Sequence, residues 1–365
     1  MVNRFRSTHT EEVSGTGDRP PGLICDRDMK FRDRSLDRGP KNEFHPRRTS
    51  LTVNEPVDRI AVKLMNMSKI AVLGRLCLAG VLIGGSFGLA ASAQAEPKRV
   101  LVVTITEGFR HSSIPTAEKV LAKLAEETGA FTVDYARVAP TDPQYKGADG
   151  KPDKAKVEAA IQAVLAEKMS AEALNHYDAV IFANTTGDLP MPDRQAFVDW
   201  IKSGKGFVGM HAATDTFPGF PGYTEMIGGH FKTHAAQLEV KPIIQDSECA
   251  ACAHLGKDWK VYDEIYQMKD FDPTKVHGLL TLDKRPDVKD PSPGEYPIAW
   301  CKEYGKGRVF YTSLGHREDV WDPTWPDRKN PKEVAEAYQK HILAGIKWAV
   351  GLEKMNAKPQ KAAVE

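Results

Sequence analysis

Three histidines stand where an imidazole could do chemistry. His111, His211 and His316 each come after a short apolar run with the character of a buried strand. An imidazole can act as a general acid or base near neutral pH, and in its neutral form it binds zinc-like metals. The small residues Ala212 and Ala213 leave room for a ligand beside His211. We expect functional roles for His211 and His316, whereas His111 could equally cap the helix expected after it.

Two other patterns leave a structural alternative open. His230 and His234 are four residues apart, a spacing that can place two metal ligands on one face of a helix. Two glycines directly precede His230 and argue against the continuous helix that such a pair needs. Asp263 and Glu264 could be surface charge on a strand. Most of the 11 histidines are expected to have no catalytic role.

Apolar runs alternate with helical patterns, which is typical of βαβ units and a mostly parallel sheet. In the first part, we expect strands over 99–104, 131–137, 178–183 and 206–210 and helices over 112–127, 154–168 and 192–202. After residue 235 the pattern shifts to strands, over 237–244, 276–282, 297–301 and 308–312, with a last helix over 331–350 and a charged, proline-rich loop over 284–296. The pattern predicts one α/β domain with an embellished C-terminal half.

Polar segments follow four of the expected strands. They are residues 106–111, 184–188, 211–216 and 313–319. In an open parallel sheet, ligands bind beyond the carboxyl ends of the strands. If these strands are parallel, the four segments converge on one edge, and the site is expected there.

Composition excludes several classes. Of the 365 residues 41% are hydrophobic and 27% are charged, and the net charge is +1. These values are typical of a globular protein rather than of a disordered, collagen-like or polytopic membrane protein. The near-neutral charge gives no electrostatic case for nucleic acid as a partner.

Residues 65–95 have the pattern of a secretory signal peptide. Lys69 and Arg75 precede an uncharged run rich in small residues, which ends in Ala-Gln-Ala at residue 95, a motif that signal peptidases cleave. The alternative is a membrane anchor, because the run is nearly long enough to span a bilayer. We favour cleavage and expect an exported protein, periplasmic or extracellular, with no membrane span after cleavage.

Residues 1–64 are rich in Arg, Asp, Pro and Gly, a composition that predicts disorder. Because a signal peptide belongs at the N-terminus, we interpret residues 1–64 as an extension from a start codon assigned too early. Translation would then begin at Met65 or Met67. The remainder divides into an α/β domain over 96–351 and a flexible tail over 352–365.

The number and spacing of the cysteines argue against a structural zinc site built from four cysteines. Cys249 and Cys252 have C-x-x-C spacing, but a second such pair is missing, which excludes a Cys₄ zinc site. In an oxidising compartment the pair is expected to form a local disulfide. Cys301 lies in an apolar run and is expected to be a buried thiol.

Several motifs follow one another in order over about residues 98–350. They are Gly108-Phe109-Arg110-His111, Asn184-Thr185-Thr186-Gly187-Asp188, Gly206-Phe207-Val208-Gly209-Met210-His211-Ala212-Ala213-Thr214-Asp215, Phe231-Lys232-Thr233-His234, Asp263-Glu264-Ile265-Tyr266, Pro297-Ile298-Ala299-Trp300 and Gly307-Arg308-Val309-Phe310-Tyr311-Thr312-Ser313-Leu314-Gly315-His316. This set closely resembles the ThuA-like, or trehalose-utilisation, family. The resemblance implies the fold of the class I glutamine amidotransferase-like superfamily. That fold is a flavodoxin-like three-layer α/β sandwich with a mostly parallel central sheet.

The chain departs from the amidotransferases at the nucleophile. Their elbow reads Gly-x-Cys-x-Gly, whereas this chain has Gly-Met-His-Ala-Ala at residues 209–213. The late His-x-Glu of that superfamily is kept as His316-Arg317-Glu318. An imidazole cannot simply replace the thiolate in glutamine hydrolysis. The resemblance therefore implies the fold and the site location without glutaminase activity.

The family resemblance implies disaccharide catabolism through 3-keto sugars, which a partner sugar 3-dehydrogenase makes. A ketone at C3 acidifies the C2 proton, so a base can start cleavage of the glycosidic bond or isomerisation. Such a reaction needs a base and a positive group near the ketone oxygen. The second interpretation is a non-catalytic carbohydrate-binding protein on an amidotransferase-like scaffold, and enzymatic activity is left open.

On this basis we expect three sets of site residues and no nucleotide cofactor. The catalytic candidates are His211, His316, Glu318, Arg110 and Asp215. The substrate-binding candidates are His111, Thr185, Thr186, Asp188, Thr214 and Tyr223. The candidate ligands of a divalent, zinc-like metal are His111, His211, His234, Glu264 and His316. Phe217, Phe220, Tyr223, Trp321 and Trp325 could stack on a sugar or pack under a lid.

Overall fold

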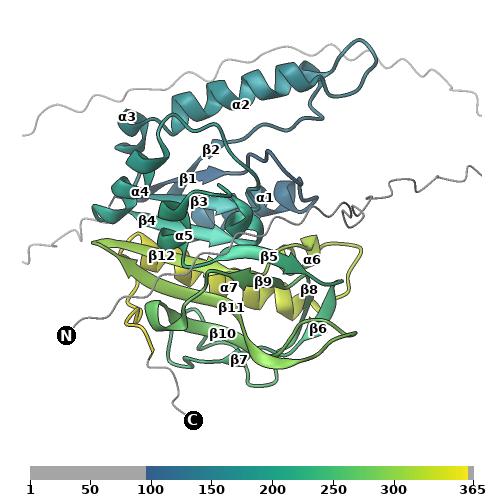
Figure 1. Cartoon of the computed structure of the whole chain (residues 1–365), viewed down its shortest axis with the longest axis vertical. Helices are drawn as coiled ribbons and strands as arrows, with labels where there is room; N and C mark the ends of the chain where they lie inside the picture. The colour runs from purple at the N-terminus through teal and green to yellow at the C-terminus, as the bar shows by residue number, and fades with distance from the viewer. Residues whose placement is uncertain (1–95, 361–365) are drawn as a thin grey trace, which may run out of the picture. The chain divides into compact units, whose positions relative to one another are not determined.

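Alternating strands and helices build one mixed sheet with helices on both faces (Figure 1). The structure, a computed structural model, describes residues 96–360. The expected N-terminal extension, the signal peptide and the end of the tail lie outside the described residues.

The central sheet has eight strands in the order β2-β1-β3-β4-β12-β11-β10-β7. Neighbours from β2 to β12 are parallel, and those from β12 to β7 are antiparallel. The parallel strands are β1 (Lys98–Val103), β2 (Phe131–Ala136), β3 (Ala179–Ala183), β4 (Gly206–Met210) and β12 (Gly307–Thr312); the others are β7 (Ile243–Ile244), β10 (His277–Lys284) and β11 (Pro293–Tyr304). The mostly parallel three-layer α/β fold expected from the sequence is confirmed.

Each face of the sheet buries its own core. On one face, α1 (Ile114–Thr128) and α7 (Lys332–Ala349) pack on alternate residues of the strands, with the short α6 (Glu318–Trp321) beside them. The other face is covered by α2 (Lys154–Lys168), α3 (Ala171–Leu174), α4 (Arg194–Lys202) and α5 (Pro221–Ile227). Burial on both faces explains why the central strands are continuous apolar runs in the sequence.

Two small antiparallel sheets embellish the second half of the chain. One pairs β5 (His230–His234) with β9 (Tyr266–Lys269), and the other pairs β6 (Leu238–Val240) with β8 (Val261–Asp263). Short 3₁₀ turns cover Pro143–Tyr145, His211–Asp215 and Pro273–Lys275. Of these elements, β5, β9 and the turn at His211–Asp215 contribute residues to the cavity described below.

Two sequence expectations in this half were wrong. The strand expected over 237–244 is two strands in different sheets, because Pro242 lacks the N–H that a continuous ladder needs. The loop expected over 284–296 is shorter, because β11 begins at Pro293, which pairs with Lys284 of β10. The first residues of β11 are exposed, as in a loop, although their backbone is paired with β10.

The chain after α7 returns to the sheet. Residues 352–360 were expected to be part of a flexible tail, yet His277 Nδ1 donates to the carbonyl oxygen of Lys358 at 2.8 Å and Ala357 is buried.

Cys249 and Cys252 are buried free thiols in the structure rather than the expected disulfide, and Cys301 is a buried thiol as expected.

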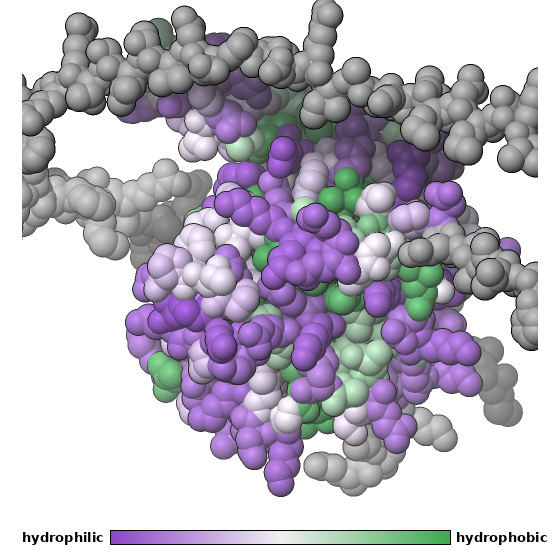
Figure 2. All heavy atoms as spheres, turned by 180° about the vertical axis from the view of Figure 1, so that it is seen from behind, coloured by the Kyte–Doolittle hydropathy of each residue, from purple (hydrophilic) through white to green (hydrophobic). Residues whose placement is uncertain are grey.

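Hydrophilic side chains cover most of the face shown in Figure 2, with apolar groups between them. Among residues 96–360, no helix combines the length and the hydropathy needed to cross a bilayer.

Gly345 lets α7 pack directly on β12. A Cβ added there would lie 2.6 Å from Cδ1 of the buried Phe310 ring. We expect Gly345→Ala to lower the free energy of unfolding by about 1–3 kcal/mol through overpacking, although alanine is intrinsically favoured in helices by about 1 kcal/mol. Urea unfolding measures the change, and the penalty should shrink in a Phe310→Leu background. A variant as stable as the wild type would contradict this close packing.

His341 gives the fold an expected pH dependence. Its Nδ1 donates to the carbonyl oxygen of Ala251, and burial lowers its pKa from 6.5 to about 4. Between these values the unfolded chain binds more protons, so stability falls as the pH falls, by about 3 kcal/mol across the window. Urea unfolding at several pH values measures this loss. His341→Asn keeps a donor but does not titrate, so its pH dependence should be flatter; equal slopes would refute the assignment.

Candidate active site

The ends of four parallel strands meet at one edge, as the sequence predicted. Ala183, Met210 and Thr312 are in register at the ends of β3, β4 and β12. The segments after β1 and β3 are joined by a bridge between Thr106 and Thr186. The amide of Asn184 donates to Gly315 O at 3.1 Å, which ties the segment after β3 to the one after β12. Residues distant in the sequence thus form one surface.

His211 occupies a strained turn directly after β4. Its φ is 47°, in the left-handed region that a non-glycine residue rarely adopts. The ring is fully buried, and Nδ1 donates to the carbonyl oxygen of Ser313 at 2.7 Å. The Tyr311 hydroxyl donates to the carbonyl oxygen of His211 at 2.8 Å. Because Nδ1 carries the proton, Nε2 presents its lone pair to the site.

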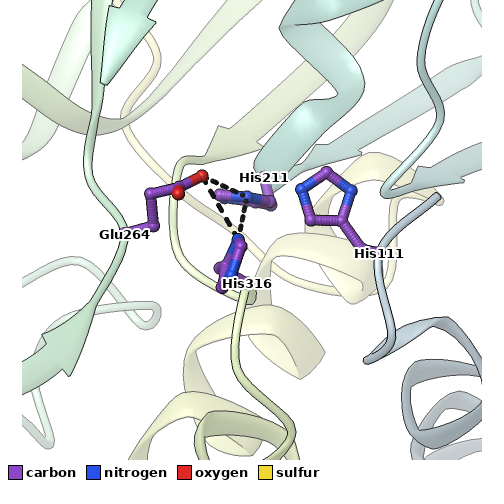
Figure 3. Close-up of side chains that lie close together, drawn as sticks. All are labelled: His111, His211, Glu264 and His316. Atoms are coloured by element: carbon purple, nitrogen blue, oxygen red, sulfur yellow. Dashed lines mark hydrogen bonds and ion pairs between the residues drawn. The ribbon is translucent and has the colours of Figure 1, made fainter. Parts of the chain in front are cut away.

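Four side chains converge at this point: His111, His211, Glu264 and His316 (Figure 3). One possible ligand atom from each lies within 4.8 Å of the others. His316 Nδ1 lies 3.2 Å from Glu264 Oε2 and 3.3 Å from His211 Nε2. His211 Nε2 lies 3.6 Å from the same Glu264 oxygen. The His111 ring packs edge-on against His211, with ring centroids 4.7 Å apart.

The donor set fits a zinc-like ion. Three imidazoles and one carboxylate are ligands that zinc takes, and ligands about 2.0–2.1 Å from a tetrahedral ion lie about 3.3 Å from one another. The three separations between His211, Glu264 and His316, 3.2, 3.3 and 3.6 Å, are close to that spacing. His111 Nδ1 is buried and has no hydrogen-bond partner among the described residues. The hydrogen bond from His211 to Ser313 is the kind of outer contact that orients a ligating histidine.

The electrostatics of the cluster favour a positive charge. Burial and the neighbouring His211 and His316 lower the pKa of His111 to about 2, so His111 is neutral, as a ligand must be. Burial alone would raise the pKa of Glu264, but the interactions of its carboxylate with the neighbouring imidazoles of His211 and His316 outweigh burial and hold the pKa below its usual range. Burial would lower the pKa of His316, yet the Glu264 carboxylate raises it above the ordinary value. The buried carboxylate therefore attracts a cation.

Asp263 positions the loop that carries His316. It is fully buried, and its two carboxylate oxygens accept from Gly315 N at 2.7 Å and Arg317 N at 3.2 Å. Its neighbour Glu264 is also buried. The surface-charge alternative considered for Asp263 and Glu264 is therefore wrong. The pair Asp263-Glu264 therefore has two roles. Glu264 is itself a candidate metal ligand, and Asp263 fixes the loop that carries the candidate ligand His316.

A cavity of about 290 Å³ opens beside the cluster. The paired strands β5 and β9 supply Phe231, His234 and Tyr266 to its wall. Its lining residues are Phe109, His111, Thr186, Asp215, Phe231, His234, Glu264, Tyr266 and His316. Of the expected site residues, the structure thus brings His111, Thr186, Asp215, His234, Glu264 and His316 to one cavity, with His211 buried behind them.

Asp215 and His234 both line this cavity but lie outside the four-residue cluster. Burial raises the pKa of Asp215, and its carboxylate has no hydrogen-bond or ion-pair partner recorded among residues 96–360. His234 lies on a strand rather than on the helix that an i, i+4 pair would need. Its Nδ1 lies 3.0 Å from Glu264 Oε1. His234 therefore stands beside the four-residue cluster rather than within it.

Three other expected residues lie outside the cavity lining. Arg110 Nη1 donates to the carbonyl oxygen of Thr104 at 3.0 Å. The Asp188 carboxylate pairs with Arg194 Nη1 at 2.6 Å. Glu318 begins α6 and contributes to the raised pKa of His316 through its charge. None of Arg110, Asp188 and Glu318 lines the cavity.

The remaining substrate-binding candidates are buried in the scaffold. The Thr185 and Thr216 hydroxyls are hydrogen-bonded at 2.7 Å, and the Thr214 hydroxyl bonds to that of Tyr311 at 3.1 Å. The Tyr223 hydroxyl donates to a backbone carbonyl of the 3₁₀ turn after β4. These side chains brace the turn that carries the site, and none lines the cavity.

The aromatic residues at the cavity differ from those considered in the sequence. Phe217, Tyr223 and Trp321 are fully buried. Phe109, Phe231 and Tyr266 line the cavity instead. Each stands inside a motif quoted for the family resemblance. Their place in these motifs was the sequence signal that could have identified them as cavity residues. A motif does not show, however, which way a side chain points.

Asp263→Asn tests the positioning role of this residue. One acceptor oxygen would become an NH₂ group facing a backbone N–H, which leaves a buried donor unpaired. We expect the free energy of unfolding to fall by about 1–3 kcal/mol and zinc affinity to weaken about 10- to 100-fold, as for other outer contacts. Urea unfolding and competitive zinc titration measure the two effects. Asp283→Asn, on the exposed end of β10, is the control and should change neither. Unchanged zinc affinity in Asp263→Asn would contradict the role.

Comparison with known proteins adds the following. The profile of the ThuA family, described as trehalose utilisation, matches residues 99–349. A putative ThuA-like protein from Parabacteroides merdae is similar at 19% identity and a TM-score of 0.52, over 71% of this chain and 92% of that chain. A putative ThuA-like protein from Bacteroides uniformis is similar at 19% identity and a TM-score of 0.51, over 73% and 97%. A search of curated proteins found no match. At these identities the structural likeness concerns the fold.

Proposed function

Because this chain belongs to the ThuA family, whose description is trehalose utilisation, we propose that it is an enzyme acting on a glycoside oxidised to a ketone at C3. The family supports a carbohydrate-related role. The finer assignment rests on the chemistry of the site. A ketone at C3 makes the C2 proton acidic, so an enzyme needs a base at C2 and a positive group near the ketone oxygen.

One observation carries the proposal. Three histidines and Glu264 converge beside Asp215, a carboxylate with a raised pKa in the same small cavity. The convergent group fits a divalent metal, and the separate carboxylate fits a base. His111, His211, Glu264 and His316 would hold the ion. When bound, it would supply Lewis-acid polarisation of a substrate oxygen.

Asp215 is the proposed base. Its raised pKa makes its carboxylate a stronger base than an exposed aspartate. It takes the C2 proton, and the electron pair of the C2–H bond forms a C1=C2 double bond as the C1–O bond breaks. The departing oxygen takes a proton, for which His234 on the cavity wall is the candidate donor. Return of the proton to the opposite face of C2, without C1–O cleavage, would instead give isomerisation to the C2 epimer.

The remaining residues hold the site together. His211 keeps its Nε2 directed at Glu264 through its bond to Ser313. Asp263 fixes the backbone on either side of His316. Thr186 lies at the cavity wall, where its hydroxyl accepts from Gly108 N and donates to the carbonyl oxygen of Phe109, which holds the loop after β1. Glutamine hydrolysis is disfavoured, because the elbow position holds His211 rather than a cysteine.

The cellular setting is part of the proposal. The signal-peptide pattern over 65–95 supports export to the periplasm or the extracellular space. A sugar 3-dehydrogenase in the same pathway would supply the ketone. Neither a nucleotide cofactor nor nucleic acid is part of the proposed reaction.

Asp215→Asn separates catalysis from binding. We expect wild-type protein to turn over methyl 3-keto-α-D-glucopyranoside, and Asp215→Asn to lower kcat by about 10²- to 10⁴-fold by removing the base. Metal content and urea stability should be unchanged, because Asp215 is outside the four-residue cluster. Asp188→Asn is the matched control. Its carboxylate pairs with Arg194 outside the cavity, and kcat and KM should stay near wild type.

Two results would overturn the assignment. Full kcat in Asp215→Asn would remove Asp215 as the base. Binding of the glycoside by wild-type protein without any turnover would favour the alternative, a carbohydrate-binding protein.

A further inference from the structure

Phe109 is a large aromatic residue that is mostly exposed and lies at the rim of the cavity. Its side chain is 67% exposed, and it is the aromatic one of the four large hydrophobic residues recorded as exposed among residues 96–360. It also lines the cavity beside the cluster. Its ring meets His111 edge-on, with centroids 4.9 Å apart, so much of the ring faces solvent. At the rim of the cavity, such a ring offers an apolar aromatic face to a ligand that projects out of the cavity.

The loop that carries Phe109 is firmly held. The Thr186 hydroxyl donates to the carbonyl oxygen of Phe109 at 2.9 Å, and Gly108 N donates to the same hydroxyl at 3.2 Å. Glu107 N donates to the carbonyl oxygen of Thr186 at 2.9 Å. The exposure of Phe109 is therefore built into the loop. A preorganised aromatic ring loses little entropy when a ligand covers it.

The size of the cavity sets the second constraint. Its volume of about 290 Å³ is at the lower limit of pockets that enclose a small organic ligand. We infer that a space of this size holds one sugar ring of a disaccharide rather than both. When one ring lies beside the cluster, the rest of a glycoside must leave through the cavity mouth.

We propose that Phe109 is the platform for the second ring, or aglycone, of the glycoside, outside the cavity. This proposal rests on the proposed function and extends it by naming the substrate class. The chain would select glycosides whose leaving group has an apolar face, because such a face can cover the Phe109 ring. The flat ring accepts different second rings, so specificity for the first ring would reside inside the cavity.

The test compares two substrates on the full-chain protein loaded with zinc. The probes are methyl 3-keto-α-D-glucopyranoside, which lacks a second ring, and 3-keto-trehalose, which has one. Phe109→Ala should raise the ratio of the disaccharide KM to the methyl glycoside KM about tenfold, the scale of a lost aromatic contact. Phe109→Trp should restore the ratio. Val288→Ala removes an apolar side chain that is 75% exposed and outside this cavity, and it should leave the ratio unchanged.

The outcomes separate this proposal from the proposed function. Turnover of both substrates with an unchanged ratio in Phe109→Ala would overturn the platform and leave the function standing. An equal loss on both substrates, with zinc content reduced, would mean that Phe109 acts through His111 and would also overturn it. If wild-type protein turns over neither substrate, the proposed function fails and the platform with it.

Discussion

The site depends on one interaction, the contact of the Glu264 carboxylate with the imidazoles of His211 and His316. A buried carboxylate is costly unless cations or donors surround it. Here the surrounding groups are themselves candidate metal ligands, and His211 lies in a strained turn with a φ of 47°. The parallel strands fix where these residues meet, because β4 and β12 end in register. The sheet therefore brings His211, after β4, and His316, after β12, close together although they are distant in the sequence.

The histidine cluster lies beyond the carboxyl ends of the parallel strands, a position that the sequence indicates because strand ends are readable from apolar runs. His111, His211 and His316 follow such runs, and parallel pairing brings them together. Their place in the cluster with Glu264 was anticipated as a ligand hypothesis. The direction of side chains within each segment was not readable. Thr186 lines the cavity while its neighbour Thr185 is buried against Thr216. Adjacent residues point to opposite sides, and composition alone cannot assign the side.

The embellished half of the chain was harder to predict, for related reasons. Short strands such as β5 and β9 have mixed polarity and owe their pairing to tertiary contacts. They nevertheless supply Phe231, His234 and Tyr266 to the cavity. Asp263 was visible as a charged residue, but its hydrogen bonds to the loop around His316 depend on a contact between segments about fifty residues apart. Local patterns do not encode such contacts. The α/β scaffold therefore follows from sequence periodicity, whereas the wall of the cavity does not.

The central claim is that His111, His211, Glu264 and His316 hold one divalent metal ion. Its most direct test is the metal content of protein purified without chelators, measured by mass spectrometry beside a His211→Ala variant of confirmed fold. The account predicts about one zinc-like ion per wild-type chain and almost none in the variant. A wild-type protein that retains no metal after incubation with zinc and dialysis, or a His211→Ala variant that retains a full equivalent, would contradict it.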